Sequence, residues 1–86
     1  MDKKRSTRKI HHVKWKGNEK IIVKETNYYP NGEVQIEGEY KDGQKHGKWI
    51  HWYENGEKWL EENYQNGTKH GESVIYYKSG DIEYEA

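Results

Sequence analysis

Short runs of alternating apolar and polar residues follow one another along this chain, separated by pairs of turn-forming residues. The pairs are Asn31-Gly32, Asp42-Gly43, Asn55-Gly56, Asn66-Gly67 and Ser79-Gly80. Asn-Gly and Asp-Gly tolerate the positive φ angles of a type I′ turn, so they are the strongest short-range hairpin signal. The runs between them have strand length and cover residues 34–40, 48–53, 57–64, 72–77 and 81–85. Because turns this short pair each strand with the next, the pattern predicts an antiparallel β meander without helices.

The same signals return every 24 residues. Residues 28–51 and 52–75 match at ten of 24 positions, and residues 76–86 begin a third copy. The repeating positions include Tyr29/Tyr53/Tyr77, Glu37/Glu61/Glu85, Tyr40/Tyr64, Lys45/Lys69 and the turn glycines Gly32, Gly43, Gly56, Gly67 and Gly80. Such a register does not arise by chance and indicates a tandem repeat.

The N-terminal part lies outside this register. Residues 10–15 and 20–25 alternate around Lys16-Gly17-Asn18-Glu19 and predict one more hairpin. Residues 1–9 are polar and basic and are expected to form a disordered tail. The predicted organisation is therefore a tail (1–9), an N-terminal hairpin (10–27) and repeats (28–51, 52–75 and the partial 76–86).

The repeated segment resembles a known family. Residues 40–49 read Tyr-Lys-Asp-Gly-Gln-Lys-His-Gly-Lys-Trp, and residues 28–33 read Tyr-Tyr-Pro-Asn-Gly-Glu. This frame is similar to the bacterial variant of the MORN repeat; the second copy departs from it with Glu62 for Gly38 and Ser73 for Trp49. The resemblance implies stacked hairpins in a single twisted sheet that serves as an interaction scaffold. The variant is often grouped with antitoxins of toxin–antitoxin pairs, so the resemblance also implies an antitoxin-like role.

If every turn is a two-residue loop, Tyr29 pairs with Val34, and Ile36 pairs with Trp49. Strand alternation then assigns the side chains to two faces. One face, which we expect to be covered, collects Tyr29, Val34, Ile36, Gly38, Tyr40, Trp49, Tyr53, Leu60, Tyr64, Ile75, Tyr77, Ile82 and Tyr84. The N-terminal hairpin or a second copy of the protein are the candidates to cover it. A one-residue bulge would move later strands to the other face.

The opposite face is the predicted partner-binding surface. It mixes aromatic, aliphatic and acidic side chains: Tyr28, Ile50, Trp52, Trp59, Val74, Tyr76, Glu37 and Glu61. Tyr and Trp are enriched at binding hot spots. The alternative is that stacking within the sheet or a homodimer buries these aromatic side chains.

Composition limits the remaining classes. The chain has 86 residues, of which 30% are apolar and 35% charged, a balance that leans toward disorder. Four Trp and eight Tyr argue for folding, because their large apolar rings with polar tips suit a thin sheet whose residues are partly exposed to water. The absence of Cys excludes disulfides and thiolate metal sites. No apolar run is long enough for a signal peptide or a membrane span, so we expect a cytoplasmic protein.

The zero net charge hides a division between the two ends. Residues 1–24 carry nine Lys/Arg and two Asp/Glu, a net charge of +7, whereas residues 25–86 carry six and thirteen, a net charge of −7. The basic cluster near Trp15 keeps nucleic-acid binding as an alternative function. The basic residues involved are Lys3, Lys4, Arg5, Arg8 and Lys9.

Catalytic and metal chemistry have weak support. The histidines, His11, His12, His46 and His70 among them, lack a convergent pattern, and the turns before His46 and His70 lie about 10 Å apart by strand spacing. Glu61 and Glu62 point to opposite faces, and the serines have no nucleophile signature around them. We therefore expect no enzyme activity, no metal and no cofactor. The sequence predicts a protein-binding module, antitoxin-like by resemblance; the alternatives are a structural protein that self-associates through its sheet face or edges, and a nucleic-acid binder.

Overall fold

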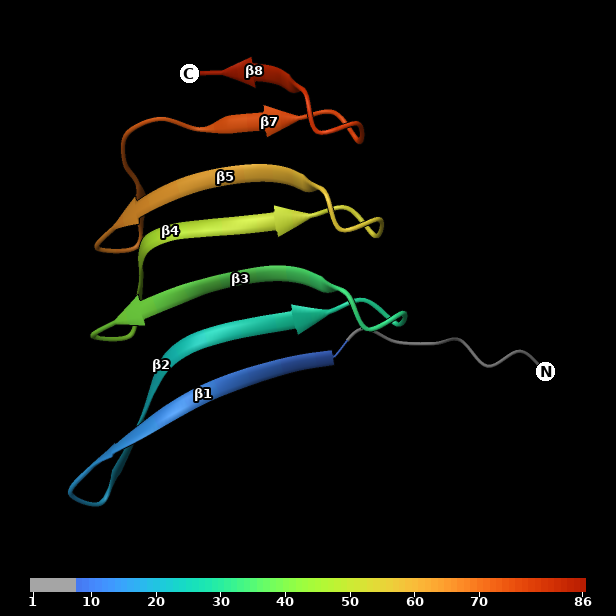
Figure 1. The fold of residues 1–86 in the computed structure, drawn as a ribbon. Helices are drawn as coiled ribbons and strands as arrows, with labels where there is room; N and C mark the ends of the chain where they lie inside the picture. Colours follow the sequence, from blue (N-terminus) through green and yellow to red (C-terminus); the bar gives the residue numbers. More distant parts are fainter. Residues whose placement is uncertain (1–7) are drawn as a thin grey trace.

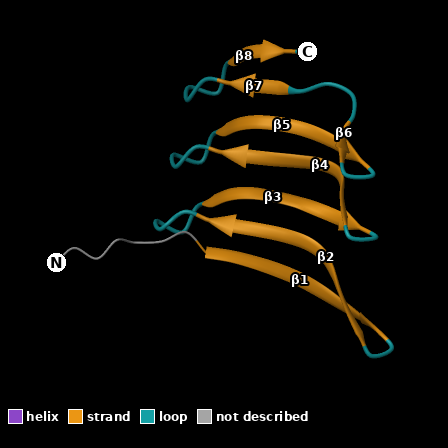
Figure 2. Ribbon diagram, turned by 180° about the vertical axis from the view of Figure 1, so that it is seen from behind, coloured by secondary structure: helices purple, strands orange, loops and turns teal. Residues whose placement is uncertain are grey.

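The computed structural model describes residues 8–86, which form one antiparallel sheet without a helix (Figure 1). Its strands are β1 (Arg8–Lys16), β2 (Glu19–Tyr28), β3 (Val34–Lys41), β4 (Gln44–Trp52), β5 (Lys58–Gln65), β6 (Thr68–Lys69), β7 (Val74–Tyr76) and β8 (Ile82–Glu85). They lie in the order β1-β2-β3-β4-β5-β7-β8, and β6 pairs with β5. The predicted all-β meander with a preceding N-terminal hairpin is confirmed. Figure 2 shows its loops along two opposite sides of the sheet.

The turns are of two kinds. Asp42-Gly43 forms a two-residue turn with φ angles of 53° and 79°, as a type I′ turn requires. The Asn31-Gly32 loop is longer than predicted, because the Tyr29 N–H donates to the Glu33 carbonyl (2.8 Å) and the Gly32 N–H to the Tyr29 carbonyl (2.9 Å). Residues 30–32 therefore form a three-residue loop. A turn spans positions 29–32, and its last residue, Gly32, has a φ of 93°. The loops at Gly56 and Gly80 repeat these bonds.

A one-residue bulge follows each of these longer loops. The register shifts after Asn27, His51 and Ile75, so Gln35, Trp59 and Glu83 have no directly opposite partner. The bulges repeat every 24 residues and correct the predicted faces. Val34 lies opposite Tyr28 instead of Tyr29, and Ile82 lies opposite Tyr76. Both residues therefore belong to the face that was predicted to bind a partner. The predicted pairing of Ile36 with Trp49 is also wrong, since Ile36 lies opposite His51.

Hydrogen bonds between successive repeats explain part of the 24-residue period. The loops at Gly32 and Gly56 each donate from a tyrosine hydroxyl and an asparagine amide to main-chain carbonyls of the next repeat. The bonds are Tyr29 Oη to Trp52 O (2.6 Å), Tyr53 Oη to Tyr76 O (2.7 Å), Asn31 Nδ2 to Glu54 O (3.2 Å) and Asn55 Nδ2 to Lys78 O (3.2 Å). The repeated Tyr and Asn residues therefore hold the hairpins in a stack.

The sheet is a single layer, with principal extents of 45 × 44 × 16 Å. Trp49 is the one fully buried apolar residue in the described part of the chain. The N-terminal hairpin continues the sheet instead of covering it, since β2 pairs with both β1 and β3 (Figure 1). Arg8 and Lys9, predicted to be in the tail, belong to β1. The rest of the predicted tail, residues 1–7, lies outside the described residues.

Candidate partner-binding face

The register defines two faces, because directly opposite residues of neighbouring strands point to the same side. The Trp49 face carries Val13, Trp15, Ile22, Glu25, Tyr29, Ile36, Gly38, Tyr40, Lys45, Trp49, His51, Tyr53, Trp59, Leu60, Glu62, Tyr64, Ile75, Tyr77 and Tyr84. The Trp52 face carries Ile10, His12, Lys24, Thr26, Tyr28, Val34, Glu37, Ile50, Trp52, Lys58, Glu61, Val74, Tyr76, Ile82 and Glu85.

Packing on the Trp49 face is centred on Trp49. Its ring lies directly over Gly38 and meets Tyr40 and Tyr64 edge to face, with centroid distances of 5.4 and 6.3 Å. The Nζ atom of Lys45 caps the ring at 4.6 Å from its centroid. The Trp49 Nε1–H donates to the Glu39 carbonyl (3.1 Å). This small cluster is the core of the sheet.

A buried carboxylate, Glu25, lies beside this core. Burial alone would raise the pKa of its carboxyl, but hydrogen bonds from Tyr40 Oη (2.8 Å) and Asn27 Nδ2 (3.1 Å), together with the nearby Lys9 ammonium, outweigh burial. The pKa of Glu25 is therefore lowered. Burial and the hydrogen bond to Glu25 raise the pKa of Tyr40 to about 12.

Glu62 is the corresponding carboxylate on the other side of Trp49. Lys69 Nζ (2.7 Å) and Tyr64 Oη (3.1 Å) contact it. These contacts lower the pKa of Glu62 although burial acts in the opposite direction. The repeat pattern gives Glu25 no special position, and strand alternation alone places Glu62. Both carboxylates act as structural acceptors.

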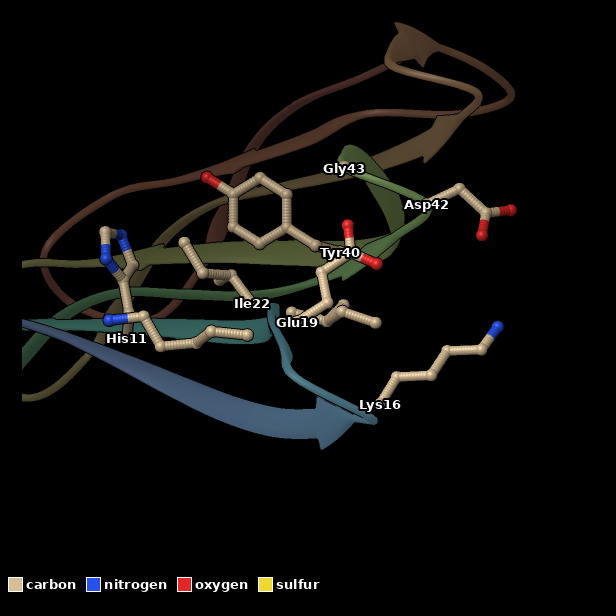
Figure 3. Close-up of a pocket in the computed structure, with 9 residues that line it drawn as sticks. His11, Lys16, Glu19, Ile22, Tyr40, Asp42 and Gly43 are labelled. Atoms are coloured by element: carbon tan, nitrogen blue, oxygen red, sulfur yellow. The ribbon is translucent and has the colours of Figure 1, made fainter.

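A groove of about 650 Å³ opens at the end of the Trp49 face, where the first half of β2 diverges from β3. Figure 3 shows His11, Ile22 and Tyr40 next to one another along it. The remaining lining comes from Lys16, Glu19, Lys20, Ile21, Asp42 and Gly43. The lining mixes apolar and charged groups.

The Trp52 face carries an aromatic stripe formed by Tyr28, Trp52 and Tyr76. Each ends the first strand of a hairpin, immediately before a three-residue loop, and each is half-buried. Their 24-residue spacing therefore becomes a row across three successive repeats. The members of this row share one face and one position in the repeat.

Carboxylates and apolar residues alternate beside the aromatic stripe. Ile50 lies directly opposite both Glu37 and Glu61, and Glu61 lies opposite Val74. Seven of the eight residues predicted to bind a partner thus come together on the Trp52 face.

Two lysine–glutamate pairs lie on the Trp52 face. Lys58 Nζ contacts Glu61 (2.6 Å) and lies 5.9 Å from the ring centroid of Tyr76. The hydrogen bond with Lys58 lowers the pKa of the Glu61 carboxyl. Glu37 accepts a hydrogen bond from Thr26 (3.0 Å) and pairs with Lys24 (3.3 Å). A partner that docks here meets carboxylates that are already held in place.

Trp59, the eighth predicted residue, lies on the other face. It is the extra residue of the bulge in β5, and its ring meets His51 edge to face at 5.4 Å and lies 6.2 Å from Tyr53. The prediction placed it on the Trp52 face because it assumed an uninterrupted alternation. The equivalent bulge positions hold Gln35 and Glu83, so no common residue type signalled the bulge.

The remaining sequence predictions concern the turn glycines, a metal site and a membrane span. The five predicted turn glycines all have positive φ, between 79° and 98°. Within residues 8–86, no three His, Asp or Glu side chains converge in a way that could hold a metal ion. The same residues contain no helix that is long and apolar enough to cross a membrane.

The comparison with known families gives one match. The model of the MORN repeat variant matches residues 23–42, 45–66 and 69–86, which is more than half of the chain. Each matched segment contains strands from one hairpin of the stack: β2 with β3, β4 with β5, and β7 with β8. No curated protein and no solved structure matches the chain.

Proposed function

Since the chain belongs to the MORN repeat variant family, we propose that it is a protein-binding module that holds its partner on the Trp52 face. Repeats of this family are commonly protein- or membrane-binding modules and are generally non-catalytic. The observation that supports the proposal most directly is the aromatic stripe, because one half-exposed aromatic side chain per repeat faces the same side of the sheet.

The chemistry of the stripe suits a protein partner. Tyr and Trp supply large contact areas and lose little conformational entropy on binding, and they dominate binding hot spots. Glu37 and Glu61 lie next to the stripe and form ion pairs with lysines of the same face. A partner with basic side chains can replace those lysines, and the net charge of −7 on residues 25–86 favours its approach.

The finer form of the proposal is an antitoxin-like protein. Binding alone would neutralise the partner by covering its working surface, without a catalytic residue, a metal or a cofactor on this chain. A cytoplasmic site of action is part of the same proposal.

The test uses two tryptophans on opposite faces. After a partner has been captured and identified by mass spectrometry, Trp52→Ala should weaken its binding by about 2 kcal/mol or more. Trp59→Ala is the matched control, because it removes the same side chain from the Trp49 face. Thermal melting of each variant separates a loss of contact from a loss of fold.

Two results would overturn the proposal. One is an unchanged affinity of the Trp52→Ala variant. The other is an equal loss in both variants, which would mean that the Trp52 face has no special part in binding.

A further inference from the structure

Most of the exposed large apolar side chains of residues 8–86 lie on the Trp49 face. Of the eight exposed large apolar side chains of residues 8–86, only Ile10 and Ile82 lie on the Trp52 face. The other six lie on the Trp49 face: Val13, Trp15, Ile22, Trp59, Tyr77 and Tyr84. Trp15 is 63% exposed and Tyr84 is 54% exposed. The concentration of these side chains on one face indicates an interaction surface.

No segment of residues 8–86 covers this face. The N-terminal hairpin was the candidate within the chain, but it continues the sheet at the β1 edge (Figure 1). The sheet is one layer, 16 Å thick, and its core is Trp49 with its neighbours. A β-sheet with an apolar face is normally stabilised by a second layer packed against it.

Charge identifies a second copy as the complementary layer. The β1 end of the sheet presents Lys9 and Lys20 on the Trp49 face, since they lie opposite Asn27 and Trp15. The β8 end presents Asp81 on the same face, opposite Tyr77, and Glu83 holds the bulge position that Trp59 holds in β5. The two ends lie at opposite sides of the sheet, so each molecule presents a basic and an acidic end.

The symmetry of a face-to-face pair decides which ends meet. With the two-fold axis parallel to the strands, the β1 end of one copy lies over the β8 end of the other, so basic groups meet acidic groups at both ends. With the axis perpendicular to the strands and in the sheet plane, like charges would meet at each end, which is costly.

We propose that two copies stack through their Trp49 faces, with the two-fold axis parallel to the strands. Stable interfaces bury roughly 800 Å² per partner, which is less than half of the rectangle spanned by the two longest extents, 45 and 44 Å. The apolar side chains of the N-terminal hairpin then pack against those of β7 and β8 of the second copy. Both Trp52 faces remain outside, so this inference does not depend on the proposed function.

Strand β8 offers a matched pair of variants for the test. Tyr84 and Ile82 are both 54% exposed and belong to the same edge strand, but they lie on opposite faces. Sedimentation equilibrium of the full chain should show a dimer. Tyr84→Asn should raise its dissociation constant at least tenfold, about 1.4 kcal/mol, whereas Ile82→Asn should leave it unchanged.

The N-terminal hairpin offers a second pair, in case the β8 variants fail to fold. Ile22 lies on the Trp49 face and is 36% exposed, and Ile10 lies on the Trp52 face and is 39% exposed. Ile22→Asn should weaken the dimer and Ile10→Asn should not. A monomeric parent chain would overturn the proposal, and so would equal losses in both members of a pair, which would indicate pairing through the strand edges.

Charge reversal tests the direction of the axis. Lys20→Glu and Glu83→Lys should each weaken the dimer by reducing the attraction between the ends, and the double variant should recover most of the loss. If Lys20→Glu alone strengthens the dimer instead, like ends meet and the proposed axis is wrong.

Discussion

The close contact between Gly38 and the Trp49 ring predicts that a methyl group added at position 38, in Gly38→Ala, destabilises the fold. A Cβ atom at position 38 would overlap the Trp49 ring at Cδ2, Cε2 and Cγ. Carbon atoms pack best about 3.5–4.0 Å apart, so in Gly38→Ala the ring must move by about 1 Å or more.

The ring has little freedom to make this movement. Tyr40 and Tyr64 flank it, and its Nε1–H is bonded to the Glu39 carbonyl. Overpacking costs about 1–3 kcal/mol, and the loss of this hydrogen bond costs about 1 kcal/mol more. We therefore expect Gly38→Ala to lower the free energy of unfolding by about 2–4 kcal/mol. For a chain of this size, that corresponds to a fall in Tm of roughly 10–30 °C.

A double-mutant cycle measured by urea unfolding is the appropriate assay. In a Trp49→Leu background the indole ring is absent, so Gly38→Ala should be nearly neutral, or stabilising because Ala loses less backbone entropy than Gly. The coupling energy should therefore be about 2 kcal/mol or more. An equal cost of Gly38→Ala in both backgrounds would refute the steric argument.

Two further predictions concern a turn and an ionisable pair. Gly43→Val should destabilise the fold by about 1–2 kcal/mol in chemical unfolding; Gly43 has φ of 79° and no atom lies near an added Cβ, so unchanged stability would mean that backbone strain is absent there. Because burial and the bond to Glu25 raise the pKa of Tyr40 from 10.0 to about 12, the neutral phenol is favoured in the folded chain. The stability that this confers is complete below pH 10 and is lost as the pH rises to about 12. Tyr40→Phe should reduce this alkaline loss in urea titrations between pH 8 and 12, and an unchanged pH profile would contradict the assignment.

The residue types of the turns explain why the fold class was predictable from the sequence. Asp42-Gly43 needs only its own backbone preferences to adopt positive φ, and such preferences are local. The 24-residue period then repeats the hairpin, and the short connections leave each strand no partner except its neighbour. The presence of the strands, their order and their antiparallel direction therefore followed from local turn preferences and short connections.

The distribution of side chains between the faces depended on contacts distant in sequence. The bulge in β5 moved Trp59 across the sheet, and the cross-strand register decided that bulge, since the equivalent residues Gln35 and Glu83 share no chemistry with Trp59. A period of two gives no warning of one added residue, because every later position still alternates.

The repeat comparison showed that Gly38 and Trp49 change together, to Glu62 and Ser73 in the second copy. The sequence by itself could mark these departures but could not relate them, because the two positions are separated by a turn. The tertiary structure supplies the reason: the Trp49 ring occupies the space above Gly38 that a side chain would need. Local chemistry therefore determined the hairpins and their period, whereas packing across strands decided which residues form the core and which face remains open.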